Sequence, residues 1–148
     1  MKITEALLGE HGLFYSEFDQ LERGLPGEMD ISAVKSQGVL LQAGIESHAR
    51  LEENLLFTNL EEKIGPMGPL AVMRSEHEEI ERTLGLLAEV EDHEQARRQL
   101  LHVVQVAREH FAKEEQVLFP LAEQALGSET LHNLGARWAE ARGVSIRS

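Results

Sequence analysis

The chain has 148 residues, a length that suits one domain built around one hydrophobic core. Its formal net charge of −12 disfavours binding to nucleic acids and to anionic membranes, because like charges repel. The absence of cysteine excludes disulfides, iron–sulfur ligation, thiolate zinc sites and cysteine nucleophiles, so any metal must be held by His, Asp, Glu or Tyr. No stretch predicts a signal peptide or a membrane span, and we therefore expect a soluble cytoplasmic protein.

Glycine and proline clusters mark the ends of the predicted helices. Loops are predicted at 24–27 and 65–69, with further breaks near 91–93 and 127–128. These breaks predict long helices over residues 3–23, 31–63, 69–91 and 93–126, followed by a shorter helix over residues 129–141. We expect Pro69 to begin the third helix, and Asp92 and Ser128 to cap the fourth and the last. Pro120 is expected to kink or interrupt the end of the fourth helix.

The order of these helices predicts an all-α fold in a single domain spanning residues 1–148. No segment alternates polar and apolar residues with period two, so we predict no strands. Short connections favour an antiparallel up-down-up-down four-helix bundle over about residues 3–126. A short C-terminal helical extension is expected over about residues 128–148, docked on the bundle by His132 and Trp138, with an oligomer contact as the alternative.

Each long helix carries an apolar stripe that includes one histidine. Apolar residues recur at spacings of three and four, which places them on one helical face. The histidines on these stripes are His11, His48, His77 and His110. Two stripes also contain a glutamate, Glu52 in the second helix and Glu114 in the fourth. The expected stripe of the fourth helix then continues through Val117 and Leu121.

The two halves of the chain repeat one pattern. Residues 48–57 and 110–119 share the form H-x-x-x-E-E-x-[LV]-L-F, and a Glu-His pair occurs at 10–11 and again at 76–77. Two similar helical hairpins facing each other would bring two equivalent ligand sets into one core. The repeat therefore predicts a pseudo-symmetric site for two metal ions. The remaining glutamates of the pattern are expected on the solvated surface, namely Glu10, Glu53, Glu76 and Glu115.

Two glutamates inside a helical core need a counter-charge. A lone buried carboxylate costs several kcal/mol or takes up a proton. The stripes carry no Lys or Arg at the level of Glu52 and Glu114, so a metal pair would supply the positive charge. Four imidazoles and two carboxylates suit iron or manganese, and imidazole also suits zinc. The predicted metal ligands are therefore His11, His48, Glu52, His77, His110 and Glu114.

This set resembles the hemerythrin-like proteins, the HHE cation-binding family. The residues that carry the resemblance are His11, His48-x-x-x-Glu52, Glu76-His77 and His110-x-x-x-Glu114-Glu115-x-x-Leu-Phe-Pro120, within about residues 5–125. The resemblance implies a four-helix bundle around a non-haem di-iron centre. Such a centre would contain two iron ions with a bridging oxo or hydroxo group, and manganese or zinc remain alternatives.

The chain departs from the oxygen-carrying hemerythrins at two positions. Glu81 stands where those proteins have a second histidine in helix three, and Glu115 stands where they have an aspartate. These departures argue against reversible oxygen storage and favour the branch linked to redox or nitric-oxide response, peroxide chemistry and iron–sulfur repair. Tyr15 and Glu81, one turn after His11 and His77, are candidates for an additional ligand or for a hydrogen bond to a bound ligand. An ordinary core-edge Tyr and a solvated Glu are the alternatives.

Three functions fit this set of residues. The first is a non-haem di-iron protein that binds or senses oxygen, nitric oxide or the iron/redox state, with its output through an unidentified protein partner. The second is a di-iron redox enzyme that acts on peroxide or nitric oxide. The third is a structural or regulatory metal site in an interaction module. The catalytic character, the native metal and the oligomeric state stay open at this point.

Overall fold

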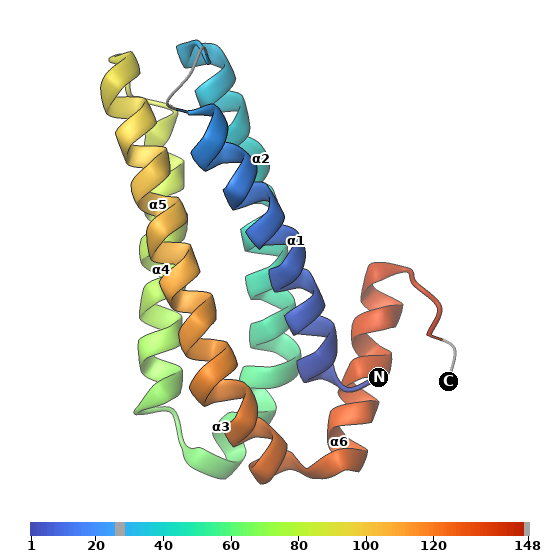
Figure 1. The fold of residues 1–148 in the computed structure, drawn as a ribbon. Coiled ribbons are helices and arrows are strands. Elements are labelled where there is room, and N and C mark those ends of the chain that lie inside the picture. Colours follow the sequence, from blue (N-terminus) through green and yellow to red (C-terminus); the bar gives the residue numbers. More distant parts are fainter. Residues whose placement is uncertain (26–28, 147–148) are drawn as a thin grey trace.

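Four long helical rods run antiparallel to one another in the computed structural model, which describes residues 1–25 and 29–146 (Figure 1). The first rod is α1 (Ile3–Gly24), and the third is α4 (Pro69–Leu87). The second combines α2 (Ile31–Leu51), η1 (Glu52–Phe57) and α3 (Thr58–Ile64). The fourth combines α5 (His93–Lys113), η2 (Glu114–Leu118) and the start of α6 (Phe119–Arg142). Within the described ranges there is no strand, and the predicted all-α four-helix bundle is confirmed.

Most of the predicted helix starts are confirmed. Pro69 is the first residue of α4, and the Asp92 carboxylate accepts a hydrogen bond from the backbone N–H of Gln95 at 2.8 Å. α4 ends at Leu87, earlier than the predicted residue 91. Of the predicted loop at 24–27, residues 26 and 27 lie outside the described residues.

The last helix leaves the bundle at a glycine rather than at the proline. Within α6 the backbone is non-helical only at Gly127, with φ 80° and ψ 162°. Pro120 comes directly after η2, so the α-helix is interrupted just before the proline, which is one of the two predicted outcomes, whereas the bend lies at Gly127. The segment after Gly127 turns back along α1 (Figure 1). Trp138 packs there against a core cluster that includes Leu7 and Phe119, but His132 is exposed, so its predicted docking role is wrong.

Two π-helical segments, η1 and η2, interrupt the second and fourth rods at equivalent places. The N–H of Thr58 donates to the carbonyl of Glu53, and the N–H of Phe119 donates to that of Glu114, each five residues back. A π turn holds one extra residue and rotates everything that follows. The predicted stripe beyond Glu114 is therefore wrong by one position. Val117 is 55% exposed, whereas Leu118 and Ala122 are buried.

The hydrophobic core consists of two clusters along the bundle axis. One includes Phe18, Leu41, Leu84 and Leu100, toward the α1–α2 end. The other includes Leu7, Leu60, Leu70 and Phe119, toward the end where α6 turns. In the first three rods the predicted metal ligands fall between the chain positions of the two clusters, and in the fourth only Phe111 of the first cluster lies between His110 and Glu114. The bundle thus encloses one polar layer between two apolar ones.

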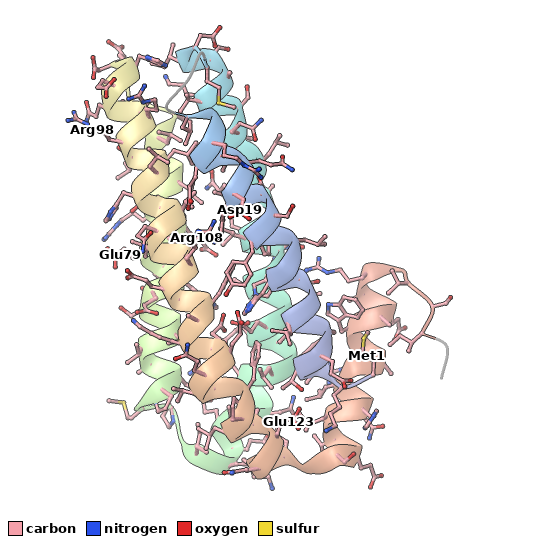
Figure 2. All side chains as sticks on the ribbon, viewed as in Figure 1. Met1, Asp19, Glu79, Arg98, Arg108 and Glu123 are labelled. Carbon is pink, nitrogen blue, oxygen red and sulfur yellow. The ribbon has the colours of Figure 1, made fainter. Side chains whose placement is uncertain are left out.

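The outer faces of the rods are charged. Arg108 of α5 reaches across to α1, where its Nη2 lies 2.6 Å from Asp19 and its Nε lies 2.7 Å from Glu22 (Figure 2). Exposed pairs of this kind contribute about 0–1 kcal/mol each. Among the helices of residues 1–25 and 29–146, none is long and apolar enough to cross a membrane.

Candidate metal centre

The polar layer brings all six predicted ligands together. Five of them are at most 1% exposed and His77 is 8% exposed. Their ligand atoms form two groups, in each of which the atoms lie within 4.8 Å of one another. One group is His11, His48, Glu52 and Glu114, and the other is Glu52, His77, His110 and Glu114. Both glutamates belong to both groups, as expected of carboxylates that bridge two metal ions.

The carboxylates lie between histidines of opposite hairpins. Glu52 Oε2 is 3.2 Å from His48 Nε2, while its Oε1 is 3.2 Å from His77 Nε2. Glu114 Oε1 is 3.2 Å from His110 Nε2 and 3.4 Å from His11 Nε2. Each glutamate therefore connects a histidine one turn earlier on its own helix with a histidine of the other hairpin.

The donor atoms of this layer have no other partners. The Nε2 atoms of the four histidines and all four carboxylate oxygens of Glu52 and Glu114 are buried without a hydrogen bond in the part of the chain that the structure describes. A buried polar group left unpaired costs about 1–3 kcal/mol, and more when it is charged. Two cations, each held by two imidazoles and sharing both carboxylates, would give all four imidazole nitrogens and both carboxylates a partner. The residues present therefore fit a two-metal centre.

In three of the histidines the second ring nitrogen, Nδ1, contacts a carboxylate. The Nδ1 atoms of His48, His110 and His11 lie 2.7 Å from Glu10, 2.9 Å from Glu76 and 3.0 Å from Glu115. An Nδ1–H that donates to a carboxylate leaves the lone pair of Nε2 free to bind a metal. The prediction that these three glutamates are solvated surface residues is therefore wrong. The repeated Glu-His pair and the second Glu of each H-x-x-x-E-E motif were the signals that could have identified them.

The electrostatics of the layer favour cation binding. Burial, assisted by the neighbouring histidines, lowers the pKa of both His11 and His110 to about 4, so both imidazoles are neutral at pH 7. Burial also acts to lower the pKa of His48, but its hydrogen bond to Glu10 and the negative charge of the adjacent Glu52 raise it to about 9. Burial and the negative charge of Glu52 raise the pKa of Glu114. Without a metal the layer would hold extra protons, which incoming cations replace.

Glu10 connects the layer to the C-terminal helix. Its carboxylate accepts hydrogen bonds from Trp138 Nε1 at 2.8 Å and from Arg142 Nε at 2.7 Å, besides that from His48. Although burial opposes ionisation, these partners lower the pKa of Glu10 to about 2. The second half of α6 is thus fixed to the residue that orients a candidate ligand.

Aromatic rings cover the layer. The ring of Phe111 stacks on His11 with centroids 4.0 Å apart, and Phe119 stacks on the same histidine at 5.5 Å. Phe57, the repeat equivalent of Phe119, stacks on His77 at 5.7 Å. These rings exclude water and keep the local dielectric low, which strengthens the attraction between the carboxylates and a cation.

Comparison with known proteins identifies the family. The family model of the hemerythrin HHE cation-binding domain matches residues 2–122 and also residues 68–142. The chain belongs to the hemerythrin HHE cation-binding family. The second match begins immediately before α4, which agrees with the repeated hairpin. Neither the curated proteins nor the solved structures give a significant match.

The two further candidates occupy different environments in this hemerythrin-family domain. The Tyr15 hydroxyl donates a hydrogen bond to Glu115, and burial together with that carboxylate raises the Tyr15 pKa. Tyr15 therefore contacts the residue that holds His11 and lies outside both ligand groups. Glu81, which stands where oxygen-carrying hemerythrins have a histidine, is half-buried and also lies outside both groups. A direct bond from Glu81 to a metal stays a prediction.

Proposed function

We propose that the protein holds a pair of iron ions in this layer and uses them to bind or sense oxygen, nitric oxide or the iron/redox state. The observation that supports the proposal is the set of four unpaired imidazole nitrogens around two unpaired, shared carboxylates. Imidazole and carboxylate together suit iron, and the shared carboxylates suit a pair of ions. When bound, the metals would supply redox chemistry and affinity for small exogenous ligands.

The number of donors favours a centre that accepts an additional ligand. Each ion would receive two imidazoles and one oxygen from each shared carboxylate. Non-haem iron sites with few protein ligands keep positions open for small molecules. A bridging oxide or hydroxide and a small exogenous ligand would complete the coordination.

Metal content and the visible spectrum test the proposal directly. The protein would be purified without added metal and without a nickel-binding tag, and measured both as isolated and after anaerobic reduction. Two irons per chain, with a charge-transfer band that bleaches on reduction, are expected. A change in the spectrum of the reduced protein on adding oxygen or nitric oxide would support gas binding, and no change with either gas would exclude it.

Two ligand variants and one control test the residue assignment. His77→Ala and Glu114→Ala each remove a donor from the buried layer, so both should lower the metal content. His102→Ala removes an exposed histidine of α5 and should leave the metal content unchanged. If both ligand variants retained two metals per chain, the assignment would be wrong.

A purely structural metal site is the second candidate, because the shared carboxylates would join the two hairpins through the ions. Zinc prefers four ligands, the number that each group offers. A colourless zinc protein that unfolds on metal removal and responds to no gas would favour this role.

Turnover of peroxide or nitric oxide that is lost in Glu52→Ala would instead indicate a redox enzyme. The cytoplasmic location and the protein partner stay predictions from the sequence.

A further inference from the structure

The two hairpins differ at their first histidine. In the first hairpin, His11 Nδ1 lies 3.0 Å from Glu115, and the Tyr15 hydroxyl one turn later donates to the same carboxylate. In the second hairpin, the position one turn after His77 is occupied by Glu81. Within the described residues Glu81 forms no hydrogen bond, so the second hairpin lacks the pair of contacts to one carboxylate that His11 and Tyr15 make in the first.

The carboxylate equivalent to Glu115 is also drawn away from His77. This residue is Glu53, which accepts a hydrogen bond from Arg74 Nε at 2.9 Å, while Arg74 Nη1 donates to Glu61 at 2.7 Å. Within residues 1–25 and 29–146, His77 Nδ1 has no hydrogen-bond partner, in contrast to Nδ1 of the other three layer histidines. His77 is 8% exposed, so the polar layer reaches the surface at this one ligand.

A charged pocket lies at this corner, between the second rod and α4. Its volume is about 360 Å³, and His77 is the only one of the six candidate ligands in its wall. The wall contains four carboxylates and two guanidinium groups. Arg74 is held by Glu53 and Glu61, whereas Glu78 and Glu81 form no ion pair with any residue that the structure describes. The pocket therefore has an excess of negative charge next to a nine-tenths-buried imidazole with a free nitrogen.

We propose that this pocket is the port through which divalent cations reach the buried centre, with Glu78 and Glu81 as the first contacts and His77 as the ligand that receives the ion. Negative charge in a concave site raises the local concentration of cations and their rate of association, but gives no advantage to a neutral gas. On the other side of the layer a second pocket reaches Glu115, but its wall contains none of the six candidate ligands. There His11 is fully buried and is covered by the rings of Phe111 and Phe119. The port rests on the two-metal centre proposed above.

The rate at which metal-free protein takes up metal distinguishes residues that assist metal entry from residues that bind the metal in the final site. Metal-free protein would be mixed with Co²⁺ alone in a stopped-flow instrument, and the visible absorption of bound Co²⁺ followed at low and high ionic strength. The double variant Glu78→Gln and Glu81→Gln should bind the same number of ions as the original protein. Its association rate at low salt should fall by about fivefold or more, and should lose most of its dependence on salt.

A matched control removes the same charge outside the pocket. Glu79→Gln with Glu89→Gln changes exposed residues of α4 and the turn after it, neither of which lines the pocket. This variant should load at nearly the original rate. Equal slowing in both double variants, or slowing in neither, would overturn the port. A lower final number of ions in the Glu78/Glu81 variant would make Glu81 a ligand and would also overturn it. If the original protein bound no ions, the proposed centre would fail together with the port.

Discussion

Glu76 holds His110 through a hydrogen bond of 2.9 Å, and its own carboxylate is held by Lys113 at 2.5 Å. Glu76→Gln replaces a charged acceptor with a neutral amide, which weakens the orientation and the basicity of the imidazole. We expect the metal affinity to fall by about 10–100-fold. A competition titration against a chelating dye measures this change. Glu79→Gln, three residues along the same helix on its outer side (Figure 2), should leave the affinity unchanged, and equal affinities in both variants would contradict the role of Glu76.

Glu114 is a candidate metal ligand, but its buried carboxylate lowers the stability of the metal-free protein. Burial and the charge of Glu52 raise its pKa, so its carboxylate destabilises the empty layer. Glu114→Met keeps a side chain of similar size without the charge. We expect the free energy of unfolding of the metal-free protein to rise by about 1–4 kcal/mol, while the bound metal is lost. Urea unfolding in the presence of a chelator checks this, and a loss of stability would contradict it.

At the scale of single residues, sequence patterns predicted the six buried donors but not the carboxylates behind them. His11 and Glu52 lie on apolar stripes, where a polar residue stands out. Glu10 and Glu115 lie beside the stripes, where a glutamate is ordinary. Their contacts with His48 and His11 join different helices, and single-helix periodicity contains no information about such pairs.

At the scale of helices, the π segments limited what periodicity could predict. Up to Glu114 the stripe of the fourth rod follows the expected spacing, and beyond it the buried residues are Leu118 and Ala122 instead of Val117 and Leu121. A π turn is intrinsically rare and persists where tertiary contacts favour it. Here each π segment begins at one of the shared carboxylates, Glu52 or Glu114. The tertiary contacts next to each π segment are therefore those of the assembled site, and the periodicity of a single helix does not reveal them.

Alanine substitutions at two glycines on different helices should change the stability of the protein in opposite directions. A Cβ at Gly135 would lie 1.9 Å from the backbone oxygen of Met1, so Gly135→Ala should destabilise the protein by about 1–3 kcal/mol by separating α6 from the N-terminus. A Cβ at Gly85 meets only the Gln42 side chain, at 3.7 Å, so Gly85→Ala should stabilise α4 by about 0.5–1 kcal/mol.

Urea unfolding measures both effects, and the fluorescence of Trp138, the only tryptophan, reports the docking of α6 in the Gly135 variant. A red shift of that emission is expected for Gly135→Ala and none for Gly85→Ala. If the two variants were equally stable, the close approach of α6 to Met1 would not hold in solution.

At the scale of the whole molecule, metal binding should control stability. A ligand that binds only the folded state stabilises it by about 2.7 kcal/mol when its free concentration is 100 times its dissociation constant. The thermal midpoint should therefore rise with free metal in the original protein and stay constant in Glu114→Met. Calorimetry over a series of buffered metal concentrations measures this, and a midpoint independent of metal in the original protein would contradict the proposed centre.

The helical class, the order of the rods and the repeat could all be predicted from the sequence, because each rests on local periodicity or on Gly and Pro breaks. The direction of α6 after Gly127 could not, because it depends on contacts with α1 that are distant in the chain. The family match over residues 2–122 covers the bundle and therefore supports the part that periodicity already predicted.

The sharing of Glu52 and Glu114 has a consequence for the order of events in folding. Each ligand group takes one carboxylate from the opposite hairpin, so neither half of the chain can assemble a complete group alone. A complete group therefore forms only after both halves have docked. If the rate-limiting step of folding precedes that docking, the completed metal centre adds its stability after the transition state. Interactions that form after the transition state slow unfolding without accelerating folding. Metal retention would thus lengthen the lifetime of the folded molecule, whereas the rate at which the molecule folds would change little with metal.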